Sequence, residues 1–145
     1  MEQRISLVTL GVEDLAASRA FYEGMGWSPG FVNDEVAFYQ LNGCVLGLWS
    51  RAALAADIGA EAGPAFEGIA LAYNVPDRAS VDRALEEASA AGGRVVKAAH
   101  DAPWGGYTGY FADADGHLWE VAWNPSWMLT PQGDVRLPLQ DSPAS

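Results

Sequence analysis

An internal repeat is the sequence feature that most constrains the fold of this chain. The apolar run at residues 5–12 leads to Asp14, and the run at residues 69–75 leads to Asp77, with matched positions 63 residues apart. Each aspartate precedes a segment with the apolar spacing of a helix, so each is expected to be an N-cap residue. Self-similarity of this kind indicates two copies of one supersecondary unit.

Each copy is predicted to contain one strand, one helix and three further strands. The helices are expected at about residues 15–25 and 78–91, and both are followed by glycine. On the first helix, Leu15, Phe21, Tyr22 and Met25 are expected to share one face. The remaining strands are expected at about residues 27–32, 36–41, 45–49, 94–99, 107–112 and 118–124.

The two copies predict an α+β protein with a single domain at residues 1–125. They span residues 4–50 and 66–124, and an Ala- and Gly-rich connector joins them at residues 51–65.

The sequence after Pro125 is rich in proline and turn-forming residues. It is expected to be an irregular extension at residues 126–145, frayed after about Leu139. Trp127, Met128 and Leu129 are apolar enough that we expect them to dock on the domain or on a partner chain.

Composition argues against several classes of partner. The chain has 19 acidic residues and 8 Lys and Arg, a formal net charge of −11, which repels nucleic acids and anionic membranes. The sequence has no run of about 18 apolar residues and no secretory pattern, so a cytoplasmic protein is expected. The single cysteine, Cys44, lies in an apolar run, which indicates a buried, inert thiol.

Glu120 stands out in the last predicted strand. Residues 118–124 alternate, so Trp119, Val121 and Trp123 point to one face and Glu120 points to the other. The aromatic face is expected to pack under a helix as core. A carboxylate in such a strand is costly to bury without a partner, so Glu120 is either held for a purpose or is an idle, hydrogen-bonded acid.

Three motif pieces together resemble the vicinal oxygen chelate superfamily, which includes glyoxalase I, bleomycin-resistance proteins and extradiol dioxygenases. They are V-T-L-G-V-E-D at residues 8–14, Phe21-Tyr22, and D-A-D-G-H-L-W-E at residues 113–120, and the resemblance covers roughly residues 4–125. It implies an incomplete eight-stranded barrel that curls around one pocket. It also implies pairing as a homodimer.

The resemblance implies metal ligands on four strands, and this sequence departs from that pattern. Leu7 and Ala70 stand where the family's histidines would be, and Glu120 matches the third position. The fourth ligand is missing too, because residues 36–56 contain no Asp, Glu or His. One carboxylate does not hold a transition metal, so neither a metal site nor a cofactor is predicted. His117 and His100 are interpreted as a turn residue and a loop residue.

A pocket on the face of Glu120 follows from strand alternation and from the resemblance. Trp104 is expected at its mouth, and Trp49 and Tyr110 fit the pocket and the core about equally. The predicted ligand-binding residues are Leu7, Trp49, Ala70, Trp104, Thr108 and Tyr110.

Three hypotheses about function remain open at this point. The leading one is a metal-free protein that binds an aromatic or amphipathic small molecule, as the family's drug-sequestering resistance proteins do. The alternative is a glyoxalase-like or dioxygenase-like enzyme, with a divalent metal held through Glu120 or with Glu120 as a general base. The third is a scaffold or regulatory dimer with a vestigial pocket.

Overall fold

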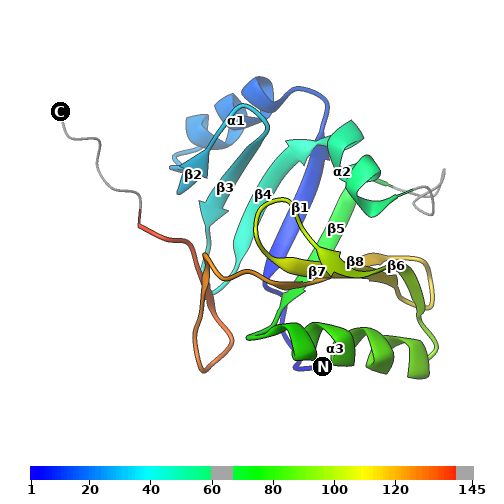
Figure 1. Ribbon diagram of the computed structural model, residues 1–145. Helices are drawn as coiled ribbons and strands as arrows, with labels where there is room; N and C mark the ends of the chain where they lie inside the picture. The colour runs from blue at the N-terminus through cyan, green and yellow to red at the C-terminus, as the bar shows by residue number, and fades with distance from the viewer. Residues whose placement is uncertain (60–66, 140–145) are drawn as a thin grey trace.

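The computed structural model describes residues 1–59 and 67–139. It confirms the α+β fold with two βαβββ repeats and an eight-stranded mixed sheet that curls without closing (Figure 1). The first repeat comprises β1 (Leu7–Val12), α1 (Leu15–Gly24), β2 (Phe31–Val32), β3 (Val36–Gln40) and β4 (Val45–Ser50). The second comprises β5 (Ile69–Asn74), α3 (Arg78–Ala90), β6 (Arg94–Asp101), β7 (Tyr107–Ala112) and β8 (Leu118–Trp123).

The strand order shows that the repeats are related by an approximate twofold axis. The order is β2-β3-β4-β1-β5-β8-β7-β6, with β1 and β5 antiparallel at the centre. Each central strand pairs in parallel with the last strand of its own repeat, β1 with β4 and β5 with β8. The sheet therefore presents matching positions of the two repeats to one concave face.

Both predicted N-caps are confirmed. The Oδ1 atom of Asp14 accepts a hydrogen bond from the backbone N–H of Ala17 at 3.1 Å, and Oδ1 of Asp77 accepts one from Ser80 at 2.8 Å. Each bond satisfies one of the backbone donors that a helix start leaves free. The same local device begins the long helix of each repeat.

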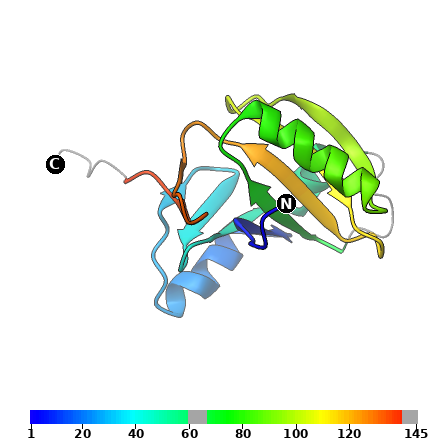
Figure 2. The same ribbon diagram turned by 90° about the horizontal axis from the view of Figure 1, so that it is seen from below.

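The long helices cover the outer face of the sheet, away from Glu120. Helix α3 lies across the strands of the second repeat (Figure 2). Its apolar residues pack with Phe111 and Val121, and Trp119 and Trp123 pack around them, so the predicted core face of the last strand is confirmed. Helix α1 packs on the strands of the first repeat.

One expectation for α1 was wrong. Phe21 and Met25 are 62% and 70% exposed, whereas Leu15 and Tyr22 pack on the core cluster of the first repeat. Leu15 and Tyr22 are two helical turns apart and share a face, and Phe21 lies about 100° away from Tyr22 around the helix. Met25 is the C-cap residue, beyond the last helical position.

The connector between the repeats contains a helix that sequence reading did not distinguish. Helix α2 (Arg51–Ile58) starts at Ser50, whose Oγ accepts from the N–H of Ala53 at 3.3 Å. Its alanines are strong helix formers, and Leu54 and Ile58 are buried. Residues 60–65 of the connector, and residue 66 after it, lie outside the described residues.

The C-terminal extension docks on the first repeat. It forms the small hairpin of β9 (Met128–Leu129) and β10 (Val135–Arg136), with Val135 1% exposed. Gln40 at the end of β3 donates to the carbonyl oxygen of Val135 at 2.9 Å and accepts from the N–H of Leu137 at 2.7 Å. Docking through Trp127 and Leu129 is confirmed, but Met128 is 64% exposed. Within the described residues, no helix is long and apolar enough to cross a membrane.

Candidate functional site

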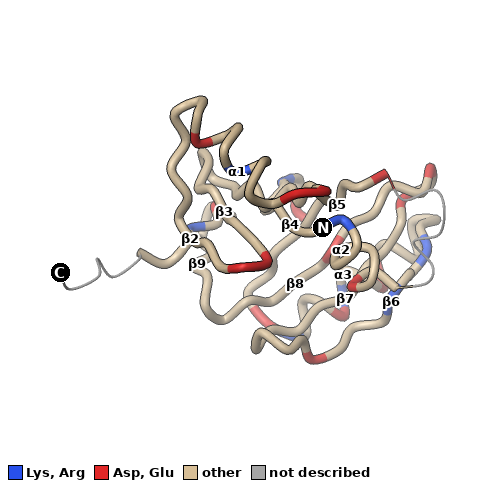
Figure 3. The backbone as a smooth tube through the Cα atoms, turned by 90° about the horizontal axis from the view of Figure 1, so that it is seen from above, with Lys and Arg blue, Asp and Glu red and all other residues tan. Residues whose placement is uncertain are grey.

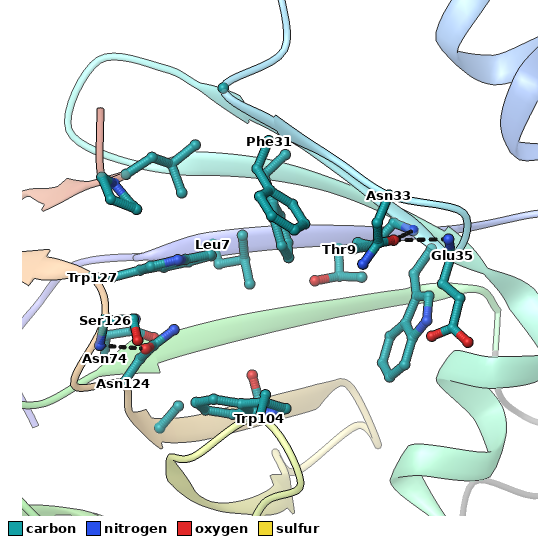
Figure 4. Close-up of a pocket in the computed structure, with 18 of the residues that line it drawn as sticks. Leu7, Thr9, Phe31, Asn33, Glu35, Asn74, Trp104, Asn124, Ser126 and Trp127 are labelled. Atoms are coloured by element: carbon teal, nitrogen blue, oxygen red, sulfur yellow. Dashed lines mark hydrogen bonds between the residues drawn. The ribbon is translucent and has the colours of Figure 1, made fainter. Parts of the chain in front are cut away.

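The concave face of the sheet encloses a cavity of about 610 Å³. Both repeats contribute to its wall, together with α2 and the C-terminal extension. In the close-up, Phe31 and Trp104 lie on opposite sides of the cavity, with Trp127 and Glu35 towards opposite ends (Figure 4). The aromatic residues of the lining are Phe31, Phe38, Trp49, Trp104, Tyr110 and Trp127.

Local geometry places the side chains of Glu35 and Trp104 at the edge of the cavity. Asn33 accepts the backbone N–H groups of Glu35 and Val36 at 2.8 Å each, which fixes the turn that carries Glu35 (Figure 4). Trp104 lies on a Gly-rich loop, and its ring occupies the space where a side chain at Gly106 would be. Glycine there allows a large ring to fold back towards the cavity.

Glu120 projects from β8 into the cavity, as alternation predicted. Its Oε2 atom accepts a hydrogen bond from the hydroxyl of Thr108 on β7 at 3.0 Å. Tyr110 is the cross-strand partner of Glu120, and its hydroxyl is also within hydrogen-bonding reach of that carboxylate. Neutral hydroxyls therefore hold the carboxylate in place.

Asp57 is the acidic residue at the inner wall of this site that sequence reasoning missed. It lies on the last turn of α2, and its Oδ2 accepts from the hydroxyl of Tyr110 at 2.7 Å. The carbonyl oxygen of Asp57 accepts from Nζ of Lys97 on β6 at 2.6 Å, which places a cation at the C-terminal end of α2. The hydroxyl of Tyr110 thus lies between two carboxylates from distant parts of the chain.

Burial and charge raise the pKa of Glu120 to about 7. Removal of the carboxylate from bulk water is the largest cause, and the negative charge of Asp57 adds to it. Hydrogen bonds from Thr108 and Tyr110 and the charge of Lys97 act in the opposite direction. Burial next to the two acids also raises the pKa of Tyr110 well above its usual value, so its hydroxyl stays a donor.

The residues at the family's metal-ligand positions do not fit a metal ion. Pairing of Thr9 with Gly47 and of Ala72 with Glu120 makes Gly47 the twofold counterpart of Glu120. A Cβ at position 47 would lie 3.1 Å from Cε1 of Phe38, so that ring occupies the space of a ligand. Leu7 and Ala70 offer no donor atom, and the described part of the chain has no group of three His, Cys, Asp or Glu placed to hold a metal.

The structure brings most of the predicted ligand-binding residues together. Leu7, Trp49, Trp104, Tyr110 and Glu120 line the cavity, and Thr108 lies behind it as the donor to Glu120. Ala70 is different, because α2 covers it: it packs with Leu54 and Ile58 and is not among the lining residues.

Several lining residues were not predicted. The aromatic residues Phe31 and Phe38 lie in the first repeat, where the sequence did not fix which face each strand turns to the cavity. Trp127 was expected to dock, but nothing in the sequence indicated that it docks at the cavity. Asp57 is a single acid in an alanine-rich run, a weak signal without the fold.

The chain has the fold of a known class of proteins. The sequence pattern of the Glyoxalase/Bleomycin resistance protein/Dioxygenase superfamily matches residues 4–121. The chain is therefore a member of that superfamily, as the motif resemblance indicated.

Three solved structures illustrate the similarity. A glyoxalase-related enzyme from Fulvimarina pelagi is 43% identical, with 94% of this chain and 99% of that chain covered and a TM-score of 0.49. The NAD-dependent benzaldehyde dehydrogenase from Legionella pneumophila is 23% identical, with 81% of this chain and 96% of that chain covered and a TM-score of 0.64. The Mn(II)-bound glyoxalase from Novosphingobium aromaticivorans is 23% identical, with 97% of this chain and 42% of that chain covered and a TM-score of 0.56. No curated protein matches the chain.

Proposed function

We propose that this protein binds an aromatic or amphipathic small molecule in the cavity without the help of a metal ion. The observation that carries the proposal is a cavity of about 610 Å³ with six aromatic side chains and with Leu7, Gly47 and Ala70 at the family's ligand positions. Cavities of roughly 300–1,000 Å³ with apolar walls and a few polar groups are typical small-molecule sites. The aromatic rings supply contact area, and the hydroxyls and carboxylates supply orientation.

The experiment combines calorimetry with analysis of the bound compound. Aromatic compounds from a broad screen that raise the melting temperature are titrated into the protein, because a ligand that binds the folded state stabilises it. Mass spectrometry of the recovered compound should show no change, and elemental analysis after incubation with Ni²⁺, Zn²⁺, Mn²⁺ or Fe²⁺ should show no stoichiometric metal. Conversion of the compound or one equivalent of metal would contradict the proposal.

Proton transfer by Glu120 is the second candidate function. A pKa of about 7 leaves a substantial fraction of this carboxylate ionised near neutral pH, which suits a general base. The test is Glu120→Gln: turnover of any compound that the protein converts should disappear while the variant stays folded, with a melting temperature no lower than that of the natural protein. An unchanged rate would exclude this role.

Pairing and location complete the proposal. The family resemblance supports a homodimer, and its test is the molar mass in solution by light scattering. Cytoplasmic location is the matching expectation, tested by fractionation of cells. A monomeric mass at all concentrations would contradict the pairing.

A further inference from the structure

The charged groups of the cavity lining all have the same sign. Glu35, Asp57 and Glu120 line the cavity, and no Lys, Arg or His is among the described lining residues. Lys97 lies close to Asp57, but its Nζ donates to the backbone carbonyl oxygen of that residue. A ligand inside the cavity therefore meets carboxylates as its charged neighbours.

The inner pair of carboxylates is held by neutral donors. Thr108 donates to Glu120 at 3.0 Å and Tyr110 donates to Asp57 at 2.7 Å, with the two acids close enough to repel each other. Hydroxyl donors satisfy lone pairs but do not compensate negative charge, and the charge of Lys97 offsets that of the two acids only in part. A positive charge brought into this space would relieve the repulsion between the two acids.

The aromatic walls suit the same kind of ligand. The faces of aromatic rings attract cations, most strongly those of Trp, and the lining includes Trp49, Trp104 and Trp127. Figure 4 shows Trp104 and Phe31 on opposite sides of the cavity. The lining thus combines aromatic and apolar walls with the pair of carboxylates, Asp57 and Glu120.

The field of the whole molecule acts in the same direction. The formal net charge is −11, and acidic side chains are spread around the chain while Lys and Arg are few (Figure 3). A field of this sign raises the local concentration of cations and lowers that of anions.

We propose that the ligand of this cavity is a monocation with an aromatic or apolar body, an arylalkylamine in its simplest form, whose ammonium group lies at Asp57 and Glu120. This inference rests on the proposed binding function and adds the charge of the ligand to it.

The test uses three probes with one aromatic body: 1-naphthylmethylamine, 1-naphthylmethanol and 1-naphthoate. Calorimetry at pH 7.5 and low salt should show that the amine binds at least about tenfold more tightly than the alcohol, with the carboxylate weakest. Asp57→Asn and Glu120→Gln should each weaken amine binding by about tenfold and alter alcohol binding by less than about threefold. Glu86→Gln, which removes one exposed acid from α3, is the matched control for net charge and should leave all three affinities unchanged.

The outcomes distinguish the charge of the ligand from the binding function itself. Equal affinity for amine and alcohol, or a preference for the carboxylate, would overturn the cationic ligand while leaving the binding function in place. Binding of none of the probes would contradict the proposed function and this inference together. If a variant at the pair fails to fold, the order of affinities for the three probes in the natural protein still provides the test, because it needs no substitution.

Proton release gives an independent readout. Groups from three elements face Glu120: Asp57 on α2, Lys97 on β6, and Thr108 and Tyr110 on β7. A cation beside Glu120 favours its ionised form, so binding of the amine at pH 6 should release protons, and binding of the alcohol should not. Calorimetry in buffers of different ionisation enthalpy measures that release, and no difference between the two probes would contradict the proposal.

Discussion

The two repeats place the same order of strands and helix around the cavity but give it different chemistry. In the first repeat the matched pair of cross-strand positions holds Phe38 and Gly47, and in the second it holds Tyr110 and Glu120. The phenyl ring lies over the glycine, whereas the phenol lies between two carboxylates. The comparison shows that the repeat determines where side chains point, and the residue at each point determines what that half of the cavity can do.

The largest effect is expected in the part that the repeats share, the core behind the cavity. Leu48 and Val121 are twofold counterparts, and both are 0% exposed. Leu48→Ala should lower the free energy of unfolding by about 2–5 kcal/mol, because it leaves a cavity in close-packed surroundings. Val121→Ala removes fewer atoms and should cost less. Urea unfolding measures the free energy of unfolding of both variants. A larger loss for Val121→Ala than for Leu48→Ala would show that the two halves of the core are not equivalent.

The next effect is a dependence of stability on pH that arises from the second repeat. The pKa of Glu120 is raised from 4.5 to about 7, so the folded state holds this proton more tightly than the unfolded state. Stability from this group is fully present below about pH 4.5 and is lost as the pH rises to about 7, by at most about 3 kcal/mol. Glu120→Gln should remove that loss, so the variant gains relative to the natural protein between pH 5 and pH 8. Parallel stability curves for the two proteins would contradict the assignment, and Glu86→Gln again serves as the control.

A smaller effect concerns the extension, which covers the first repeat. Gln40 forms hydrogen bonds to the carbonyl oxygen of Val135 and the N–H of Leu137, and Trp127 packs on Phe38 with ring centroids 5.0 Å apart. Gln40→Ala should cost about 1–3 kcal/mol, since both backbone groups lose a partner. It should also shift the fluorescence emission of Trp127. The same substitution in a Trp127→Phe background is the control and should show no such shift. An unchanged spectrum would mean that the extension docks without this residue.

The smallest difference is expected at the helix starts, where the repeats agree. Asp14→Ala and Asp77→Ala each remove a single N-cap hydrogen bond and should each cost about 0.5–2 kcal/mol. Because each carboxylate accepts from the backbone N–H three residues further along the chain, thermal unfolding should give losses in the same range. A difference of more than about 1.5 kcal/mol would show that one helix depends on tertiary packing far more than the other.

Most of the fold could be predicted from the sequence because its signals are local. Alternation along residues 118–124 placed Glu120 and Trp119 on opposite faces, and the two caps located the starts of α1 and α3. The prediction was weaker where the signal was short. Strand β2 covers only Phe31–Val32 of the segment expected at about residues 27–32, and the alanine-rich start of the connector forms α2.

The candidate site could be predicted in part. Leu7, Tyr110 and Glu120 face the cavity through the period-two geometry of their strands, which the sequence displays, and Trp104 was expected at its mouth on a Gly-rich loop. Ala70 has the same periodicity, but whether it reaches the cavity depends on α2, which packs over it. Periodicity gives the direction of a side chain and says nothing of what another segment lays across it.

The sequence by itself determined the repeat, the helix starts, the inward direction of Glu120 and the excess of negative charge, since each depends on neighbouring residues or on composition. The tertiary structure alone decided that Asp57 meets Tyr110 at 2.7 Å, that Phe38 lies over Gly47, and that Trp127 lines the cavity. Those contacts join residues far apart in the chain. Their distances depend on how whole elements pack, and no local pattern in the sequence encodes that packing.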